Sequence, residues 1–203
     1  IGPSHSGKSE LVIKIVASNY IWVNRPEHII YCAPYLEDRQ PYLRRLKAAV
    51  AASQGIFHCL DTIPTVRELH NILGVDPTQE EPEPAILILD DIMSFDHALR
   101  KRLTQLMVME SHHSNLTIIL CQQNPFPPGP EFVTCNRNLT GRFILYQLND
   151  WRGIVNINNI MFPGKKNFLP TCLTEAKEVL DCNYIFVNSY PFSKLRRRHT
   201  CYT

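Results

Sequence analysis

The chain has 203 residues, of which 44% are hydrophobic and 20% are charged, and its formal net charge is +2 at pH 7. This length suits one α/β domain with a substantial core, and the composition excludes an extended disordered or fibrous chain. A net charge this small gives no argument for a nucleic-acid partner, and no apolar run approaches the length of a membrane span.

The first predicted element is a phosphate-binding loop at the start of the chain. Its residues fit the pattern G-x-x-x-x-G-K-S/T at every fixed position and are Gly2-Pro3-Ser4-His5-Ser6-Gly7-Lys8-Ser9. In such a loop, backbone N–H groups and the positive end of the next helix bind phosphate oxygens. We therefore predict that the loop binds ATP, with Lys8 as a catalytic contact on the β- and γ-phosphates and Ser9 on Mg²⁺. The alternative is a chance match in a turn of glycine and serine.

The residues on either side of the loop bear on this prediction. Residues 11–17 follow directly and are typical of the helix into which such a loop opens. Only Ile1 precedes Gly2, whereas a phosphate loop joins a buried strand to a helix. We therefore expect the chain to be a fragment that lacks most of its first strand, and to be less stable than a chain extended upstream.

Further along, apolar runs alternate with helical segments. Strands are predicted at 28–33 and 56–60, and helices at 42–50 and 65–73. Residues 74–84 are acidic and rich in proline, so we expect an exposed loop that lengthens one crossover without dividing the domain.

The second half of the chain continues this alternation. Strands are predicted at 85–90, 116–121, 142–146 and 184–187, with a helix from Asp96 to about Glu110 and two more helices in the tail. The pattern predicts a mainly parallel sheet with helices on both faces, in a single domain over residues 1–203 that ends in a basic tail at 194–203. Functional side chains should then gather at the carboxyl ends of the strands.

Two aspartates stand at the tip of the predicted strand at 85–90. Four apolar residues, Ile86 to Leu89, would bury this strand, and Asp90 and Asp91 follow them. A carboxylate there can hold Mg²⁺ opposite Ser9, which is the role we assign to Asp90. Asp91 falls where many such ATPases place the acidic residue that polarises the attacking water. The alternative is that both aspartates only end the strand and cap the next helix.

Three further residues are candidates for the site. Gln123 follows the strand at 116–121, where a neutral amide can sense the γ-phosphate or orient water; the alternative is a glutamine that closes the strand and pairs with the backbone. Arg137 and Arg142 are candidates for an arginine finger that reaches a neighbouring subunit's nucleotide. The alternative for each is a surface arginine.

Cysteine usage bears on the compartment. The seven cysteines include no C-x-x-C pair, and the histidines lack the spacing of metal ligands. An odd number of thiols without metal spacing is typical of an intracellular protein with reduced cysteines, so we predict no structural metal.

Three motifs, in this order, resemble those of the FtsK–HerA superfamily of ATPases. They are the loop at 2–9, the strand end at 86–91 and the strand end Ile118-Ile119-Leu120-Cys121-Gln122-Gln123-Asn124-Pro125-Phe126. Within that superfamily the chain looks most like the genome-packaging ATPases of poxviruses, other large DNA viruses and Polinton (Maverick) elements. The discriminating features are Gln-Asn-x-Phe at 123–126, an Asn/Asp-x-Arg turn at 149–152 and an apolar-Phe-Pro step at 161–163. One departure is His5, where relatives commonly have glycine; a positive φ there would carry a steric cost.

The resemblance implies a P-loop NTPase fold of the RecA/FtsK type and an ATP-driven motor, usually a ring, that threads double-stranded DNA into a preformed capsid. The implied cofactors are ATP and Mg²⁺, and the implied partners are double-stranded DNA, further copies of the chain and a capsid or portal protein, with no membrane. The expected location is the host nucleus or a viral assembly site. By position, the resemblance carries over Lys8 and Ser9 as phosphate and magnesium contacts, Asp90 as the metal carboxylate, Asp91 as the catalytic acid and Gln123 as the sensor.

Two other functions stay open at this point. A small-molecule kinase acting on nucleosides or nucleotides could use the same loop, although the sequence shows no convincing arginine-rich lid. An inactive nucleotide-binding remnant would bind ATP without turnover and act only as a scaffold for other subunits.

Overall fold

The computed structural model describes residues 1–74, 83–92, 97–110, 115–124, 142–146, 151–180 and 184–188. The chain divides into two compact units, which we call the sheet unit, Gly7–Cys121, and the hairpin unit, Ile1–Ser6 with Gln122–Thr203. The boundary between the two units falls inside the predicted phosphate loop, between Ser6 and Gly7. A single domain over 1–203 stays a prediction. Most of the acidic loop at 74–84 and all of the tail at 194–203 lie outside the described residues.

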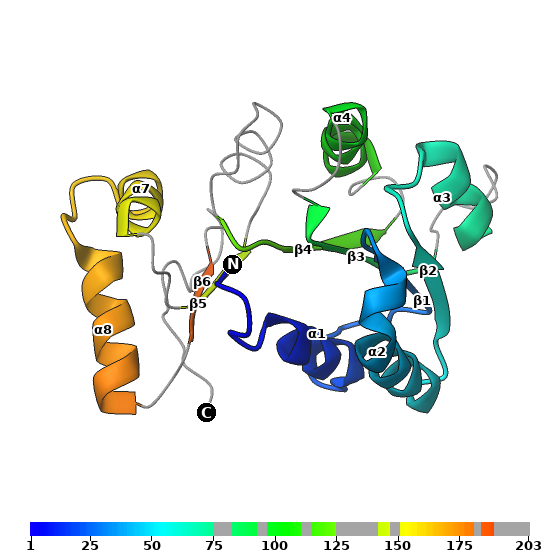
Figure 1. Ribbon diagram of the computed structural model, residues 1–203, viewed down its shortest axis with the longest axis horizontal. Coiled ribbons are helices and arrows are strands. Elements are labelled where there is room, and N and C mark those ends of the chain that lie inside the picture. The colour runs from blue at the N-terminus through cyan, green and yellow to red at the C-terminus, as the bar shows by residue number, and fades with distance from the viewer. Residues whose placement is uncertain are drawn as a thin grey trace. The chain divides into compact units, whose positions relative to one another are not determined.

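The sheet unit is built on four parallel strands. They are β1 (His28–Cys32), β2 (Ile56–Leu60), β3 (Ala85–Asp90) and β4 (Leu116–Cys121), in the order β2-β1-β3-β4. In the register, Cys32 lies beside Leu89, and Asp90 lies beside Cys121, so the carboxyl ends of the strands meet at one edge (Figure 1). The predicted α/β class with a parallel sheet is confirmed for this unit.

Helices cover both faces of this sheet. Figure 1 shows α1 (Lys8–Ala17) and α2 (Gln40–Ala52) below the strands, and α3 (Val66–Leu73) and α4 (His97–Gln105) above them. A π-helical turn, Leu106–Glu110, continues α4. Consecutive parallel strands are joined by crossover connections that run over one face of the sheet. The helices in these connections therefore cover the faces and bury the strands.

The core of the sheet unit explains the apolar runs of the sequence. Below the sheet, Ile29 and Ile88 pack against Val12 of α1 and Leu46 of α2. The residues between them point to the other face and are also buried; Ile30, Leu87 and Leu89 are all 0% exposed. A strand buried on both faces is apolar at every position rather than at alternate ones, as the sequence of β3 shows.

The ends of two helices follow local sequence signals. At the start of α3, the Thr65 side chain accepts a hydrogen bond from the Glu68 N–H while the Glu68 carboxylate accepts one from the Thr65 N–H, which is a capping box. Helix α2 begins at Gln40, earlier than predicted, because Pro41 is tolerated in the first turn of a helix. A short 3₁₀ helix that was not predicted, η1 (Leu36–Arg39), precedes it.

The hairpin unit pairs two strands in antiparallel fashion, β5 (Arg142–Tyr146) and β6 (Tyr184–Asn188). Helices α7 (Trp151–Met161) and α8 (Phe168–Leu180) connect them along the chain. Among the described residues of this unit, Asn158 is a polar residue buried between the two helices and is 2% exposed. Its amide donates to the Lys165 carbonyl at 2.8 Å and accepts from the Leu169 N–H at 2.8 Å, so it ties the two helices together.

The first residues of the chain are paired with this hairpin. The Ile1 amino group donates to the Ile144 carbonyl at 2.7 Å, and the Tyr146 N–H donates to the Ile1 carbonyl at 2.9 Å. On the other side, the Gly2 N–H donates to the Gln122 carbonyl at 3.0 Å. Ile1 and Gly2 are therefore held by backbone hydrogen bonds as the last residues of a strand are. The predicted phosphate loop begins at Gly2. Within the part of the chain that the structure describes, each helix is too short or too polar to span a bilayer.

Candidate nucleotide site

The first half of the predicted phosphate loop belongs to the hairpin unit. A side chain at Gly2 would place its Cβ 2.6 Å from Cβ of Tyr146 and 2.8 Å from Oγ of Ser6, so only glycine fits here. The Ser6 N–H donates to the Pro3 carbonyl at 3.3 Å and closes a tight turn. The Ser6 hydroxyl is buried and has no hydrogen-bond partner among the described residues. A buried hydroxyl in this state favours a site that gains a polar ligand.

Two residues of the loop have left-handed backbone conformations. Gly7 has φ 92° and forms the N-cap of α1, whose first-turn N–H groups follow it. His5 has φ 60°, so the positive φ considered for this position is present in a residue other than glycine. Such a conformation costs of order 1 kcal/mol for a residue with a Cβ and turns backbone N–H groups in a direction that regular structure does not allow.

Lys8 is the first residue of α1 and is half-buried. Burial lowers the pKa of its ammonium group, and the charges of Cys121, Asp90 and Asp91 oppose that shift. The interaction with the two aspartates means that the structure brings the loop lysine and the acidic pair together within the sheet unit. Ser9, the other predicted contact in α1, is half-buried.

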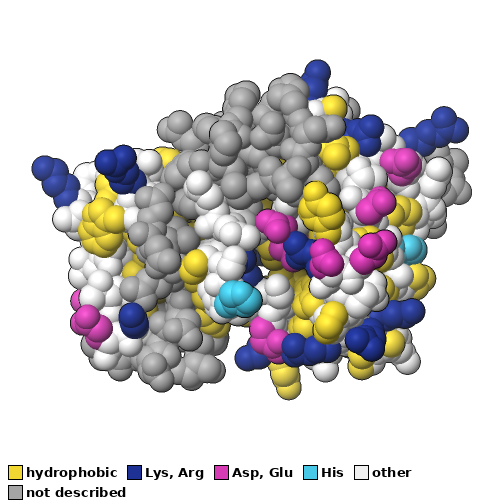
Figure 2. All heavy atoms as spheres, in the orientation of Figure 1, with side chains coloured by type: hydrophobic (Ala, Val, Ile, Leu, Met, Phe, Trp, Pro, Cys, Tyr) yellow, Lys and Arg dark blue, Asp and Glu magenta, His cyan; other side chains and the backbone are white. Residues whose placement is uncertain are grey.

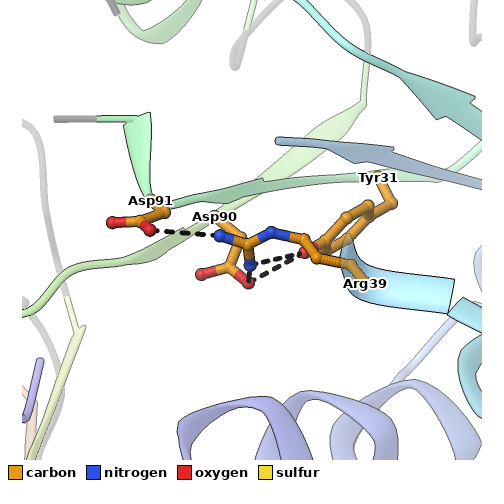
Figure 3. Close-up of polar contacts among 4 residues, drawn as sticks. All are labelled: Tyr31, Arg39, Asp90 and Asp91. Atoms are coloured by element: carbon orange, nitrogen blue, oxygen red, sulfur yellow. Dashed lines mark hydrogen bonds and ion pairs between the residues drawn. The ribbon is translucent and has the colours of Figure 1, made fainter. Parts of the chain in front are cut away.

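Asp90 ends β3 and is 7% exposed. Its Oδ2 atom accepts a hydrogen bond from the Tyr31 hydroxyl at 2.8 Å and another from Nη1 of Arg39 at 2.7 Å (Figure 3). Burial and the charge of Asp90 raise the pKa of the Tyr31 hydroxyl, so the phenol stays protonated and acts as a donor.

Asp91 differs from Asp90 in both backbone and exposure. It has φ 58°, and its N–H donates to the Cys121 carbonyl at 3.3 Å. Its side chain is 39% exposed, against 10% for that of Asp90, and its Oδ2 accepts from Nη2 of Arg39 at 3.1 Å. The pair therefore consists of one buried carboxylate and one that faces solvent, which suits one oxygen ligand for a metal and one contact for water.

No protein-family model matches the chain, and no curated protein matches it. The resemblance to the FtsK–HerA superfamily therefore depends on the sequence motifs alone.

Arg39 and Tyr31 belong to this site and were not predicted. Arg39 lies in the connection directly after β1, and Tyr31 lies within β1, the strand beside β3. The rule that functional groups gather at the carboxyl ends of parallel strands could have drawn attention to a basic residue in that connection. Which strand lies next to β3 is decided by the sheet order, and the sequence did not specify it.

The other predicted site residues are placed as follows. Gln123 is exposed after β4, whereas its neighbour Gln122 is 2% exposed and accepts from the Gly2 N–H. Arg142 is exposed at the start of β5, and Arg137 lies outside the described residues. Gln123 and Arg142 belong to the hairpin unit, and their assignment to the site of Lys8 and the acidic pair stays a prediction.

The oxygen donors of the site fit a magnesium ion. Carboxylates and hydroxyls, here those of Asp90 and Ser9, are the hard ligands that Mg²⁺ prefers. Among the described residues, no three His, Cys, Asp or Glu side chains gather as a metal cluster. At nucleotide sites Mg²⁺ usually takes few ligands from protein and the rest from phosphate and water.

Proposed function

We propose that this chain is a Mg²⁺-dependent P-loop ATPase that drives double-stranded DNA during the packaging of a viral or transposon genome. The observation that carries the ATPase is the packing of α1, which Lys8 begins, against β3, which Asp90 ends: Val12 of the helix and Ile88 of the strand share one core cluster. The charges of Asp90 and Asp91 act on the Lys8 ammonium group, which is consistent with this packing. A lysine behind a glycine turn and an acidic pair at a strand tip are the two halves of a nucleotide site, and here they act on each other.

Each residue has a distinct part in this proposal. The loop N–H groups and Lys8 bind the β- and γ-phosphates of ATP, and Ser9 and Asp90 hold the metal. Bound Mg²⁺ would neutralise charge on the phosphate oxygens. Asp91, the more exposed carboxylate, orients the attacking water and accepts its proton.

The motor function is supported by the resemblance of the motifs at 2–9, 86–91 and 118–126 to those of packaging ATPases. It implies double-stranded DNA, further copies of the chain in a ring and a capsid or portal protein as partners. In such a ring an arginine from a neighbouring copy could complete the site, with Arg142 and Arg137 as the candidates and Gln123 as the sensor of the γ-phosphate.

The test is ATP hydrolysis by the chain with Mg²⁺, measured with and without linear double-stranded DNA. Hydrolysis that DNA stimulates supports the motor, and hydrolysis indifferent to DNA supports only the ATPase. Phosphoryl transfer to a nucleoside or nucleotide would show a kinase instead. Binding of ATP with no turnover under any of these conditions would identify an inactive remnant.

A further inference from the structure

We infer that Arg39 is a positioning residue for the proposed ATPase: its guanidinium fixes the orientation of Asp90 and Asp91 together. The inference rests on the proposed function, and it concerns a residue that the phosphate-loop and acidic-pair motifs do not contain.

The geometry is that of one guanidinium shared between two carboxylates. Nη1 of Arg39 lies 2.7 Å from Oδ2 of Asp90, and Nη2 lies 3.1 Å from Oδ2 of Asp91 (Figure 3). The two nitrogens are held in one rigid plane, so the spacing between them sets the spacing between the two carboxylates. An ammonium group is a single point of charge and cannot impose that spacing.

The hydrogen bonds from Arg39 and Tyr31 use one oxygen of Asp90 and not the other. Oδ2 of Asp90 accepts from both Arg39 and the Tyr31 hydroxyl. Oδ1 accepts no hydrogen bond from the described residues, and Figure 3 shows it pointing away from Arg39. A carboxylate fixed through one oxygen presents the other in a defined direction, as a metal ligand requires.

Arg39 also offsets part of the repulsion between two adjacent carboxylates. Asp90 and Asp91 are consecutive, and like charges at this separation repel one another. The Arg39 side chain is 24% exposed, so its interaction with the buried carboxylate of Asp90 is screened less than a surface ion pair would be. Burial tends to lower the pKa of Arg39, but Tyr31, Asp90 and Asp91 outweigh that tendency and raise it, so the group stays charged.

The backbone that carries Arg39 is itself fixed. Arg39 is the last residue of η1 and the N-cap of α2, directly after β1. The Tyr31 ring, on β1, packs against the ring of Tyr42, on α2, with centroids 5.4 Å apart. The guanidinium therefore comes from regular structure rather than from a long loop, which is the support that a positioning residue needs.

Helix α2, which begins directly after Arg39, offers a matched control. Arg45, on α2, donates to Glu10 on α1 at 2.7 Å, but these side chains are 59% and 46% exposed. Lys and Arg side chains gather over α1 and α2 in Figure 2, at the surface. Arg45→Lys therefore makes the same substitution in an arginine–carboxylate ion pair that also measures 2.7 Å but does not include Asp90 or Asp91.

The experiment compares Arg39→Lys with wild type and Arg45→Lys. For each protein, kcat for ATP is measured by steady-state kinetics, the Kd of Mg²⁺–ATP by calorimetry and the melting temperature by circular dichroism. In Arg39→Lys we expect kcat to fall by about 10- to 100-fold while the Kd changes by less than about threefold, because a misdirected carboxylate impairs the reaction more than binding. Arg45→Lys should keep the kcat of wild type.

A second variant tests the guanidinium itself. In Arg39→Ala, added guanidinium ion at millimolar concentration should restore part of the lost kcat, and it should restore none in Asp91→Asn. A folded Arg39→Lys with the kcat of wild type would overturn the role of Arg39 alone. So would Arg39→Lys that is unfolded where wild type is folded, because Arg39 would then act through stability. A wild-type chain that neither binds nor hydrolyses Mg²⁺–ATP would overturn the proposed function, and the role of Arg39 with it.

Discussion

The Tyr31 hydroxyl donates a 2.8 Å hydrogen bond to Oδ2 of Asp90 across two neighbouring parallel strands. Tyr31 is 0% exposed and Asp90 is 7% exposed, so the bond lies at the border between the hydrophobic core and the candidate site. The Tyr31 hydroxyl and the Arg39 guanidinium both donate to Oδ2 of a side chain that is largely shielded from water, so they supply hydrogen bonds that solvent cannot.

Replacing Tyr31 by phenylalanine removes this donor and keeps the ring that packs on Tyr42. Because Asp90 is buried, we expect Tyr31→Phe to lower the free energy of unfolding by about 1–3 kcal/mol. Chemical denaturation followed by circular dichroism measures this change. Tyr35→Phe is the control, since Tyr35 is 73% exposed and its hydroxyl should matter by less than about 0.5 kcal/mol. Equal stability of Tyr31→Phe and wild type would show that the hydroxyl does not support Asp90.

Lys8 is expected to contribute to nucleotide binding through its charge. Lys8→Ala should weaken the binding of Mg²⁺–ATP by about 10- to 100-fold, the loss expected for a charge-assisted hydrogen bond to phosphate. Calorimetric titration measures the affinity. Lys14→Ala is the matched control, because Lys14 is an exposed lysine on the same helix, α1. Unchanged affinity in Lys8→Ala would exclude the loop as the phosphate site.

Asp91 is expected to act on the reaction and not on binding. Asp91→Asn keeps the size of the side chain but removes a base, so ATP binding should persist while turnover falls by about 100- to 10,000-fold. Single-turnover hydrolysis and ATP binding are measured on the same preparation. Asp61→Asn, an exposed aspartate directly after β2, should leave turnover unchanged. If Asp91→Asn hydrolyses ATP at the rate of wild type, Asp91 has no part in activating water.

A pair of histidines, His28 at the start of β1 and His58 in the middle of β2, predicts acid sensitivity. Nδ1 of His28 lies 3.1 Å from Nε2 of His58, and the rings stack with centroids 5.3 Å apart. Burial, followed by the charge of His28, lowers the pKa of His58 below its usual 6.5. The unfolded chain then binds more protons than the folded one as the pH falls below 6.5, so stability is lost with acidification through the folded pKa.

The measurement for this pair is the denaturant midpoint between about pH 7.5 and about pH 5.5, with His58→Gln beside wild type. We expect the midpoint of wild type to fall more steeply with acidification than that of His58→Gln. His70→Gln, a change in α3 outside the pair, should follow wild type. The same slope in His58→Gln and wild type would rule out the pair as a source of the acid sensitivity.

Much of the architecture could be predicted because its signals are local. The apolar run of β3 is buried at every residue, and a run of this kind is visible without knowing its neighbours. The ends of α3 likewise depend on residues close together in the sequence. Thr65 and Glu68 form the capping box at its start, and Gly74, in a left-handed conformation, ends it. The helix predicted at 42–50 begins two residues earlier, at Gln40, because Pro41 stands inside the first turn, where proline is tolerated.

What the sequence determined by itself is the glycine turn before α1, the strands of the sheet and the acidic pair at the tip of β3, because backbone geometry and burial constrain each of these within a few residues. What only the tertiary structure decided is which side chains contact this acidic pair. Arg39 and Tyr31 reach Asp90 because β1 lies beside β3 in the order β2-β1-β3-β4, and no local pattern specifies that order. Strand neighbours are chosen by the packing of the whole sheet, so a side chain whose role depends on a neighbouring strand is recognised only once the sheet is assembled.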